Sequence, residues 1–195
     1  MGRRIVIIQG HPDPAGGHLD HALARAYAEG AGAAGHAVRV IEVATLEFSW
    51  LRSQREWTED PPPPGIAEAQ RTVQWADHLL IVYPLWLGAM PARLKGFLEH
   101  LLRPGFAVGD YRAGHLPRKL LKGRSARVVV TMGMPALVYR WYYRAHGLKY
   151  LRRNILGFCG IGPIRVTLIG GVGALSTARA ARWLGRLRAL GEGAR

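Results

Sequence analysis

The sequence predicts an open, doubly wound α/β fold with about five parallel strands. Five short segments are predominantly apolar and rich in β-branched residues, which is typical of strands buried on both faces of a parallel sheet. They span residues 4–8, 37–43, 78–83, 125–131 and 164–169. Segments with helical spacing lie between them, as crossover connections require. A length of 195 residues with 49% hydrophobic content suggests one domain over residues 1–195.

Helices are expected between the strands because apolar residues recur there every three or four positions. In the first of them Leu19, Leu23 and Tyr27 share one face. The insertion that follows the fourth strand, residues 133–163, has a helical, aromatic and basic middle. The other expected helices span residues 19–32, 66–77, 91–102 and 176–190.

A long irregular stretch, residues 45–65, follows the second strand. It contains Trp50, Trp57 and four consecutive prolines, residues 61–64, which we expect to lie outside any helix or central strand. Two interpretations of this surface loop stay open. Its tryptophans pack on the core, or the loop covers a ligand or a partner subunit.

The chain is strongly basic, with a formal net charge of +14. This balance favours anionic partners, but a solvated basic face explains it equally well, and no specific nucleic-acid partner is predicted. The single cysteine, Cys159, fits a reducing compartment. The first residues lack an apolar signal segment, and no apolar stretch reaches the ~20 residues of a membrane span. We therefore expect a cytoplasmic protein.

Ligands of open α/β sheets bind beyond the carboxyl ends of the strands. The loops after strands one, three and four begin at Gly10, Pro84 and Met132 and should meet there. The first loop ends at a helix start, where backbone N–H groups favour a phosphate. The third loop supplies flat and apolar side chains. A phosphate cradle beside apolar walls suits an aromatic cofactor with a phosphate tail.

A metal site is not expected. The histidines His11, His18 and His21 cluster in the sequence, but no carboxylate or cysteine framework with ligand spacing accompanies them.

Several short motifs, taken in their order and spacing, resemble the flavodoxin-like NAD(P)H:quinone oxidoreductase family. They are Gly10–Pro12, Tyr83–Trp86, Met90–Phe97, Gly105–Ala107 and Thr131–Gly133. That family includes quinone reductases, modulator-of-drug-activity enzymes and ancillary oxidoreductases of potassium efflux systems. The resemblance runs from residue 4 to about residue 190. It implies a flavodoxin-like five-stranded sheet in the order 2-1-3-4-5, with a helical insertion after strand four.

The resemblance also implies a function. Members bind FMN or FAD, take a hydride from NAD(P)H on flavin N5, and pass two electrons to a quinone or similar flat acceptor. The alternative is a flavodoxin-like regulatory subunit that binds flavin or nucleotide and docks on an acidic partner such as the channel domain of a potassium efflux membrane protein. Many members are homodimers, for which Trp50, Trp57 and residues 139–153 are candidate interface residues.

The family's motifs assign the candidate site residues. Tyr139 falls at the spacing of the active-site tyrosine, and His146 lies near the place of its companion histidine, so both are expected to be catalytic. Where relatives carry a serine in the phosphate loop, this chain has Gly16–His18, whose backbone N–H groups and imidazole would replace the hydroxyl. The expected cofactor-binding residues are His11, Gly16, Gly17, His18, Pro84, Leu85, Trp86, Leu87, Thr131, Met132 and Gly133.

Overall fold

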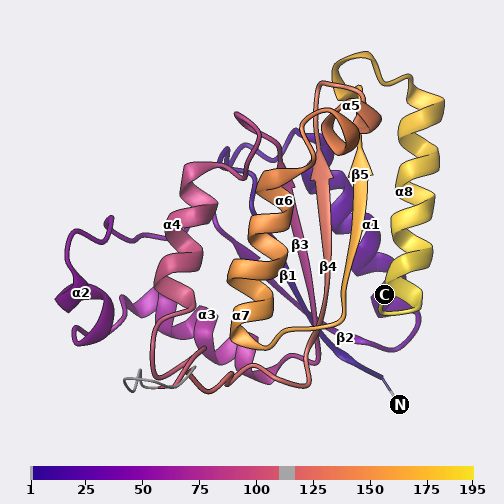
Figure 1. The fold of residues 1–195 in the computed structure, drawn as a ribbon. Coiled ribbons are helices and arrows are strands. Elements are labelled where there is room, and N and C mark those ends of the chain that lie inside the picture. The colour runs from indigo at the N-terminus through magenta and orange to yellow at the C-terminus, as the bar shows by residue number, and fades with distance from the viewer. Residues whose placement is uncertain (1, 110–116) are drawn as a thin grey trace.

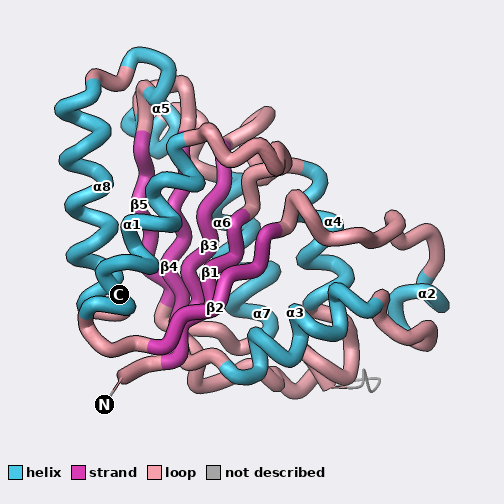
Figure 2. Tube along the Cα trace, turned by 180° about the vertical axis from the view of Figure 1, so that it is seen from behind, coloured by secondary structure: helices cyan, strands magenta, loops and turns pink. Residues whose placement is uncertain are grey.

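The structure, a computed structural model, describes residues 2–109 and 117–195. Its centre is a parallel sheet in the order β2-β1-β3-β4-β5, covered by helices on both faces (Figures 1 and 2). The predicted fold class, strand order and helical insertion are confirmed. The strands are β1 (Arg4–Gln9), β2 (Ala37–Glu42), β3 (His78–Pro84), β4 (Ser125–Thr131) and β5 (Ile164–Ile169).

The core lies in two layers, one on each face of the sheet. Helices α1 (Leu19–Ala33) and α8 (Thr177–Glu192) pack against each other on one face. Glycines allow this close approach, because a Cβ on Gly30 would lie 2.0 Å from the Arg188 carbonyl oxygen. The other face carries α3 (Pro64–Trp75) and α4 (Ala92–Leu101).

The insertion after β4 covers the same face as α4. It comprises α5 (Ala136–Trp141), α6 (His146–Tyr150), the π-helical turn η1 (Leu151–Leu156) and α7 (Gly157–Cys159). A Cβ on Gly147 would lie 2.2 Å from the Gly88 carbonyl oxygen, so only glycine lets α6 reach the loop after β3. A short 3-10 helix, η2 (Val172–Ala174), joins β5 to α8.

The proline-rich stretch departs from the prediction. It contains a short helix, α2 (Gln54–Thr58), and Pro64 is the first residue of α3. The expectation that all four prolines lie outside helices is therefore wrong for Pro64. At that position the missing N–H has no partner to lose, and the fixed φ suits a helix.

The tryptophans of this stretch pack on α4. The Trp50 ring lies over Gly96, where a Cβ would meet it at 2.4 Å. The Trp57 indole donates a hydrogen bond to the Glu99 carbonyl at 3.1 Å. Arg103 donates to the Trp57 carbonyl at 2.7 Å, which holds α2 against the end of α4.

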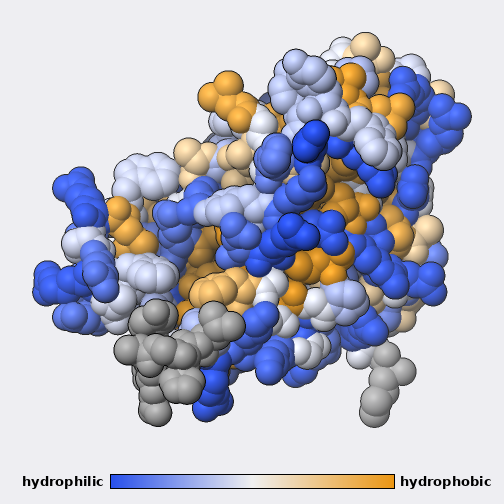
Figure 3. All heavy atoms as spheres, viewed as in Figure 1, coloured by the Kyte–Doolittle hydropathy of each residue, from blue (hydrophilic) through white to orange (hydrophobic). Residues whose placement is uncertain are grey.

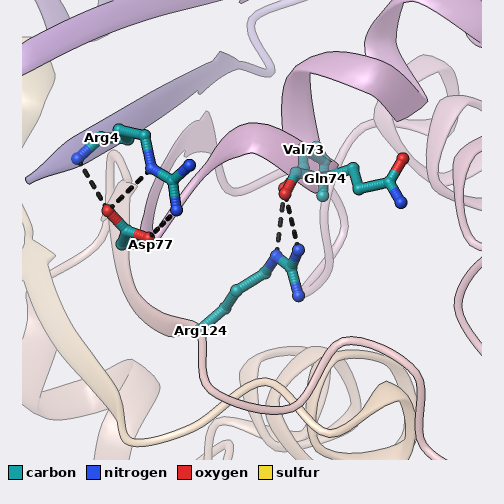
Figure 4. Close-up of polar contacts among 5 residues, drawn as sticks. All are labelled: Arg4, Val73, Gln74, Asp77 and Arg124. Atoms are coloured by element: carbon teal, nitrogen blue, oxygen red, sulfur yellow. Dashed lines mark hydrogen bonds and ion pairs between the residues drawn. The ribbon is translucent and has the colours of Figure 1, made fainter.

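Two arginines make hydrogen bonds near the amino ends of the strands, at the opposite end of the sheet from the loops described below (Figure 4). Arg4 donates hydrogen bonds to both carboxylate oxygens of Asp77, at 3.1 and 2.6 Å, and these bonds lower the pKa of Asp77 to about 2. Arg124 donates to the carbonyls of Val73 and Gln74 at the end of α3, at 3.1 and 2.7 Å. Across the described residues, every helix is too short or too polar to cross a membrane.

Candidate cofactor site at the carboxyl ends of the strands

The loop after β1 runs from Gly10 to His18, where α1 begins. Gly10 lets it start against β3 and α4: the Gly10 N–H donates to the Val82 carbonyl at 2.7 Å, and a Cβ there would lie 2.7 Å from a Leu94 methyl carbon. Gly16 has a φ of +77°, in the left-handed region that favours glycine. The side chain of His18, the N-cap, makes no capping hydrogen bond, so the helix start is not closed by its own residue.

Three histidines gather at this helix start. The rings of His11 and His18 stack with centroids 3.9 Å apart, and the ring of His21 lies 5.2 Å from that of His11. Asp13 accepts a hydrogen bond from His18 Nε2 at 2.7 Å. Burial and the neighbouring histidines lower the pKa of His11 to about 4, so His11 is neutral at pH 7. An exposed His18 therefore lies on a buried, neutral His11.

A buried carboxyl group connects α1 to β4. Asp20 lies in the first turn of α1, and Thr131 Oγ1 lies 3.0 Å from both of its oxygens and donates to the carboxylate. Burial raises the pKa of Asp20 to about 6, although the hydrogen bond from Thr131 opposes the shift. Asp20 is thus close to half-ionised in mildly acidic solution.

The loop after β3 is a tight turn. Trp86 and Ala89 exchange backbone hydrogen bonds of 2.9 and 3.0 Å. Between them Leu87 has φ +45° and Gly88 has φ +79°, which is typical of a two-residue turn with both central residues left-handed. The turn holds the Trp86 side chain 51% exposed and leaves Leu87 in solvent. An indole and a leucine therefore face outward at the end of β3.

These loops contact one another. The Leu85 N–H donates to the Thr131 carbonyl at 2.7 Å, which joins the loop after β3 to the end of β4. The ring of Trp86 lies edge-on to His11, with centroids 6.4 Å apart, which joins it to the loop after β1. The predicted convergence of the three loops is confirmed.

The backbone that follows β4 completes the site at the carboxyl ends of the strands. Met132 is buried, and its N–H donates to the Ile169 carbonyl at 2.9 Å. Gly133 is exposed, and a Cβ at this residue would meet no atom within 4 Å. Unhindered backbone therefore lies at the carboxyl end of β4.

Tyr139 lies in α5 with its side chain only 1% exposed. Its hydroxyl accepts a hydrogen bond from the Leu148 N–H at 3.1 Å and donates to the Gly88 carbonyl at 3.4 Å. Desolvation raises the pKa of this phenol. Tyr139 thus connects the insertion to the turn after β3, and its oxygen is occupied by the backbone of both.

His146 is exposed at the start of α6. The two residues before it, Arg144 and Ala145, have φ values of +52° and +48°, so the chain turns sharply between α5 and α6. The Ala145 N–H donates to the Tyr139 carbonyl at 3.0 Å, which closes this turn. The group that donates a hydrogen bond to the Tyr139 hydroxyl is the backbone N–H of Leu148, not the side chain of His146.

Sequence reasoning missed Asp13 and Asp20 as members of this cluster. The pairing of Asp13 with His18 had a signal, since an aspartate in a proline-rich turn before a helix commonly bonds nearby groups. The pairing of Asp20 with Thr131 had none, because 111 residues separate the two in sequence.

The residues present fit a phosphate-bearing aromatic group. The His18 side chain does not cap α1, so the backbone N–H groups at the start of this helix are available to a phosphate. A Cβ on Gly17 or Gly133 would meet no atom within 4 Å, so a ligand can approach the backbone there. The buried Nδ1 of His21 has no hydrogen-bond partner among the described residues. Apolar side chains lie beside these polar groups at the turn after β3. Within the described ranges, no three His, Cys, Asp or Glu side chains are grouped to hold a metal ion.

A profile of the family described as having the flavodoxin-like fold matches residues 3–190. The chain belongs to this family. The resemblance carried by the motifs is thereby confirmed for nearly the whole sequence.

Members with similar sequences are named as quinone reductases. Ribosyldihydronicotinamide dehydrogenase [quinone] of Mus musculus is 26% identical over 186 residues, which cover 82% of this chain and 78% of the mouse protein. FMN-dependent NADH:quinone oxidoreductase 1 of Bradyrhizobium diazoefficiens is 29% identical over 129 residues, 64% of this chain. The chain spans only 61% of that protein's length and 62% of the length of a relative from Penicillium crustosum.

A solved structure has the same fold. The NAD(P)H:quinone oxidoreductase from Methanothermobacter marburgensis superposes with a TM-score of 0.81 at 22% identity, covering 99% of this chain and 97% of the other.

Proposed function

We propose that this protein is a flavin-dependent NAD(P)H:quinone oxidoreductase that uses FMN. The observation that carries the proposal is the meeting of the three loops, which gathers an uncapped helix start, an exposed indole and bare glycine backbone at one edge of the sheet. Bound FMN would supply the two-electron chemistry that links hydride donation by NAD(P)H to reduction of a quinone or similar flat acceptor. The name of the Bradyrhizobium relative supports FMN over FAD.

The loop after β1 would hold the phosphate. Backbone N–H groups at Gly16 and Gly17 and the positive end of α1 favour an anion. His18, oriented by its 2.7 Å bond to Asp13, would replace the serine hydroxyl of relatives. His11 would support the ring of His18 from below, since the two rings stack.

The other two loops would hold the ring system. Pro84, Leu85, Trp86 and Leu87 would form an apolar wall. On the other side Thr131, Met132 and Gly133 would offer backbone, and a Gly133 N–H is suited to a developing negative charge.

Tyr139 and His146 would serve the acceptor side. The Tyr139 hydroxyl, bonded to Gly88 and Leu148, would keep the turn after β3 in place and so position Trp86. His146 is exposed and would contact the acceptor directly. The two residues therefore have separable roles, one in positioning and one in contact.

Replacement of Gly133 tests the cofactor site without disturbing the fold. Gly133→Val places a side chain in open space, so the melting temperature of the FMN-free protein should stay unchanged, whereas FMN affinity should fall by about tenfold or more. Gly185→Ala in α8, where a Cβ also meets nothing, is the control. Fluorescence titration of FMN measures the affinity. Equal affinity in both variants would remove Gly133 from the site.

Tyr139→Phe and His146→Ala separate the two acceptor-side roles. Loss of the Tyr139 hydroxyl leaves the buried Leu148 N–H unpaired, so we expect a loss of about 1–2 kcal/mol in the free energy of unfolding and a lower kcat. His146→Ala should raise KM for the quinone and leave stability unchanged. Steady-state kinetics with chemical denaturation distinguishes them. If neither variant alters kcat or KM, both residues lie outside the acceptor side.

The regulatory alternative rests on the basic surface of the chain. A protein that binds FMN but shows no turnover with NAD(P)H and any quinone would favour it over the enzyme.

We also infer a homodimer. An apolar groove of about 230 Å³ lies between α4 and the insertion, and a second copy is its proposed occupant. Its lining includes Trp57, Leu98, Leu102, Tyr150 and Phe158. Light scattering should give about twice the 21.5 kDa mass of the chain. A fully active monomer would contradict the inference.

A further inference from the structure

A wide groove on the described part of the molecule lies apart from the three loops. It has a volume of about 680 Å³ and follows β5, with Val166, Thr167 and Leu168 in its lining. The insertion forms one wall and α8 the other. β5 is an edge strand, hydrogen-bonded to β4 alone within the described sheet. This groove therefore exposes strand backbone rather than a closed surface.

The register of the sheet determines which backbone groups face the groove. The Ala126 N–H donates to the Pro163 carbonyl at 3.0 Å, and the Met132 N–H donates to the Ile169 carbonyl at 2.9 Å. In a parallel pair, every second residue between these two points bonds to the neighbouring strand. The N–H and C=O groups of Ile164, Val166 and Leu168 consequently point away from β4. They recur at every second residue, the spacing at which a further strand would pair with them.

Both walls of the groove are positively charged. Arg144, Lys149 and Arg152 lie on the insertion side, and Arg186 lies on α8. Figure 3 shows hydrophobic surface over the β5 region between hydrophilic side chains on the α6 and α8 sides. None of the ion pairs found within the described residues involves a cation of the groove.

The sequence keeps this region free of negative charge. No Asp or Glu occurs between Asp110 and Glu192, a span that includes both walls and β5. The net charge of +14 is therefore concentrated where the edge strand is open. An uncompensated field of one sign along a groove attracts an anionic ligand.

We propose that this groove binds an acidic, extended segment of another protein, which adds to β5 as a further strand. The segment's backbone would pair with the outward groups of Ile164, Val166 and Leu168. Side chains alternate across a strand, so acidic residues would face Lys149 and Arg152 on one side and Arg186 on the other.

The same charges argue against other occupants. Pairing with β5 of a second copy would bring two positive walls together, which is unfavourable. A single-stranded nucleic acid would engage the cations but leave the strand's outward amides without backbone partners. The acidic peptide uses both features of the groove.

Anisotropy of a fluorescein-labelled peptide tests the proposal on the whole protein. In this peptide pairs of Glu residues are separated by single Val residues, so that both faces of the extended strand carry Glu. Val166→Pro removes the central outward N–H but no bond to β4, and should weaken binding about tenfold. Val166→Thr keeps that N–H and should bind like the parent. Arg152→Glu should also weaken binding about tenfold, whereas Arg71→Glu on α3, with the same change of charge, should have no effect.

Three results would overturn the proposal: no binding at low salt, equal binding by Val166→Pro and Val166→Thr, or tighter binding of single-stranded DNA of equal charge that displaces the peptide. If Val166→Pro fails to fold, a peptide N-methylated at alternate residues replaces it. Methylation of the edge that faces β5 should abolish binding, whereas methylation of the opposite edge should not. The test needs no flavin and is independent of the proposed activity.

Discussion

At the scale of single residues, Asp20 and His11 have opposing effects on the pH dependence of stability near the candidate phosphate site. Folding raises its pKa from 3.8 to about 6, so the folded state binds more protons than the unfolded state between about pH 4 and 6. This group therefore makes the free energy of unfolding fall as pH rises through that window. His11, whose pKa is lowered to about 4, acts in the opposite direction, with stability rising from about pH 4 to 6.5.

Asp20→Asn should remove the contribution of Asp20 to this pH dependence and leave that of His11. At pH 7 the variant should be more stable than the parent, by about 2–3 kcal/mol, because a buried carboxylate is replaced by a neutral amide that still accepts from Thr131. The difference should vanish below about pH 4, where Asp20 is protonated in both states. Urea unfolding across pH measures both quantities. A less stable variant at pH 7 would show that the charge of Asp20 is compensated.

The sequence was informative about residues that act through the backbone and less so about long-range pairs. Gly10 could be assigned to a strand-to-helix turn because only local spacing is involved. The buried environments of Asp20 and Tyr139 depend on contacts with Thr131 and Leu148 that arise only when separate elements pack. The role of Tyr139 in holding Gly88 was likewise invisible to spacing.

At the scale of elements, the turn after β3 combines strain with exposure. Leu87 is in the left-handed region, which costs a leucine about 1 kcal/mol or more, and its side chain packs on nothing. Strain at an exposed apolar residue suggests a functional constraint on the turn. The Trp86 side chain depends on the same turn for its position.

Leu87→Asn should release this strain. Asparagine tolerates the left-handed region, so we expect a gain of about 1 kcal/mol in the free energy of unfolding. Because Leu87 is proposed to form part of the apolar wall for the ring system, FMN should bind more weakly to the variant. Leu137→Asn, an exposed leucine in α5, is the control and should not stabilise the protein. Denaturant unfolding decides the point, and a destabilised Leu87→Asn variant would contradict the assignment of strain.

Element boundaries were predictable where a single signal dominated. The spans of β4 and β5 agree with the structure because each segment rich in β-branched residues is bounded by turn residues. The start of α3 was misplaced because the proline run was taken as a unit, although its last member is favourable at a helix start.

At the scale of the whole molecule, the meeting of the three loops could be predicted, since ligand sites of parallel sheets lie beyond the carboxyl ends of the strands. The strand order was predicted from the resemblance to the flavodoxin-like family. The charged groove along β5 could not be predicted, because it depends on how far the insertion and α8 stand from the edge strand. The molecule therefore has two distinct functional candidates, a cofactor site at the carboxyl ends of the strands and a basic groove along one edge.

The central claim concerns the first of these, and anaerobic absorption spectroscopy tests it most directly. The protein is loaded with FMN, titrated with NADH or NADPH, and then given a quinone. The account predicts that FMN stays bound through gel filtration, that its visible absorption bleaches with one equivalent of reduced nicotinamide, and that one equivalent of quinone restores it. A protein that takes up no FMN, or holds FMN that reduced nicotinamide does not bleach, would contradict the account.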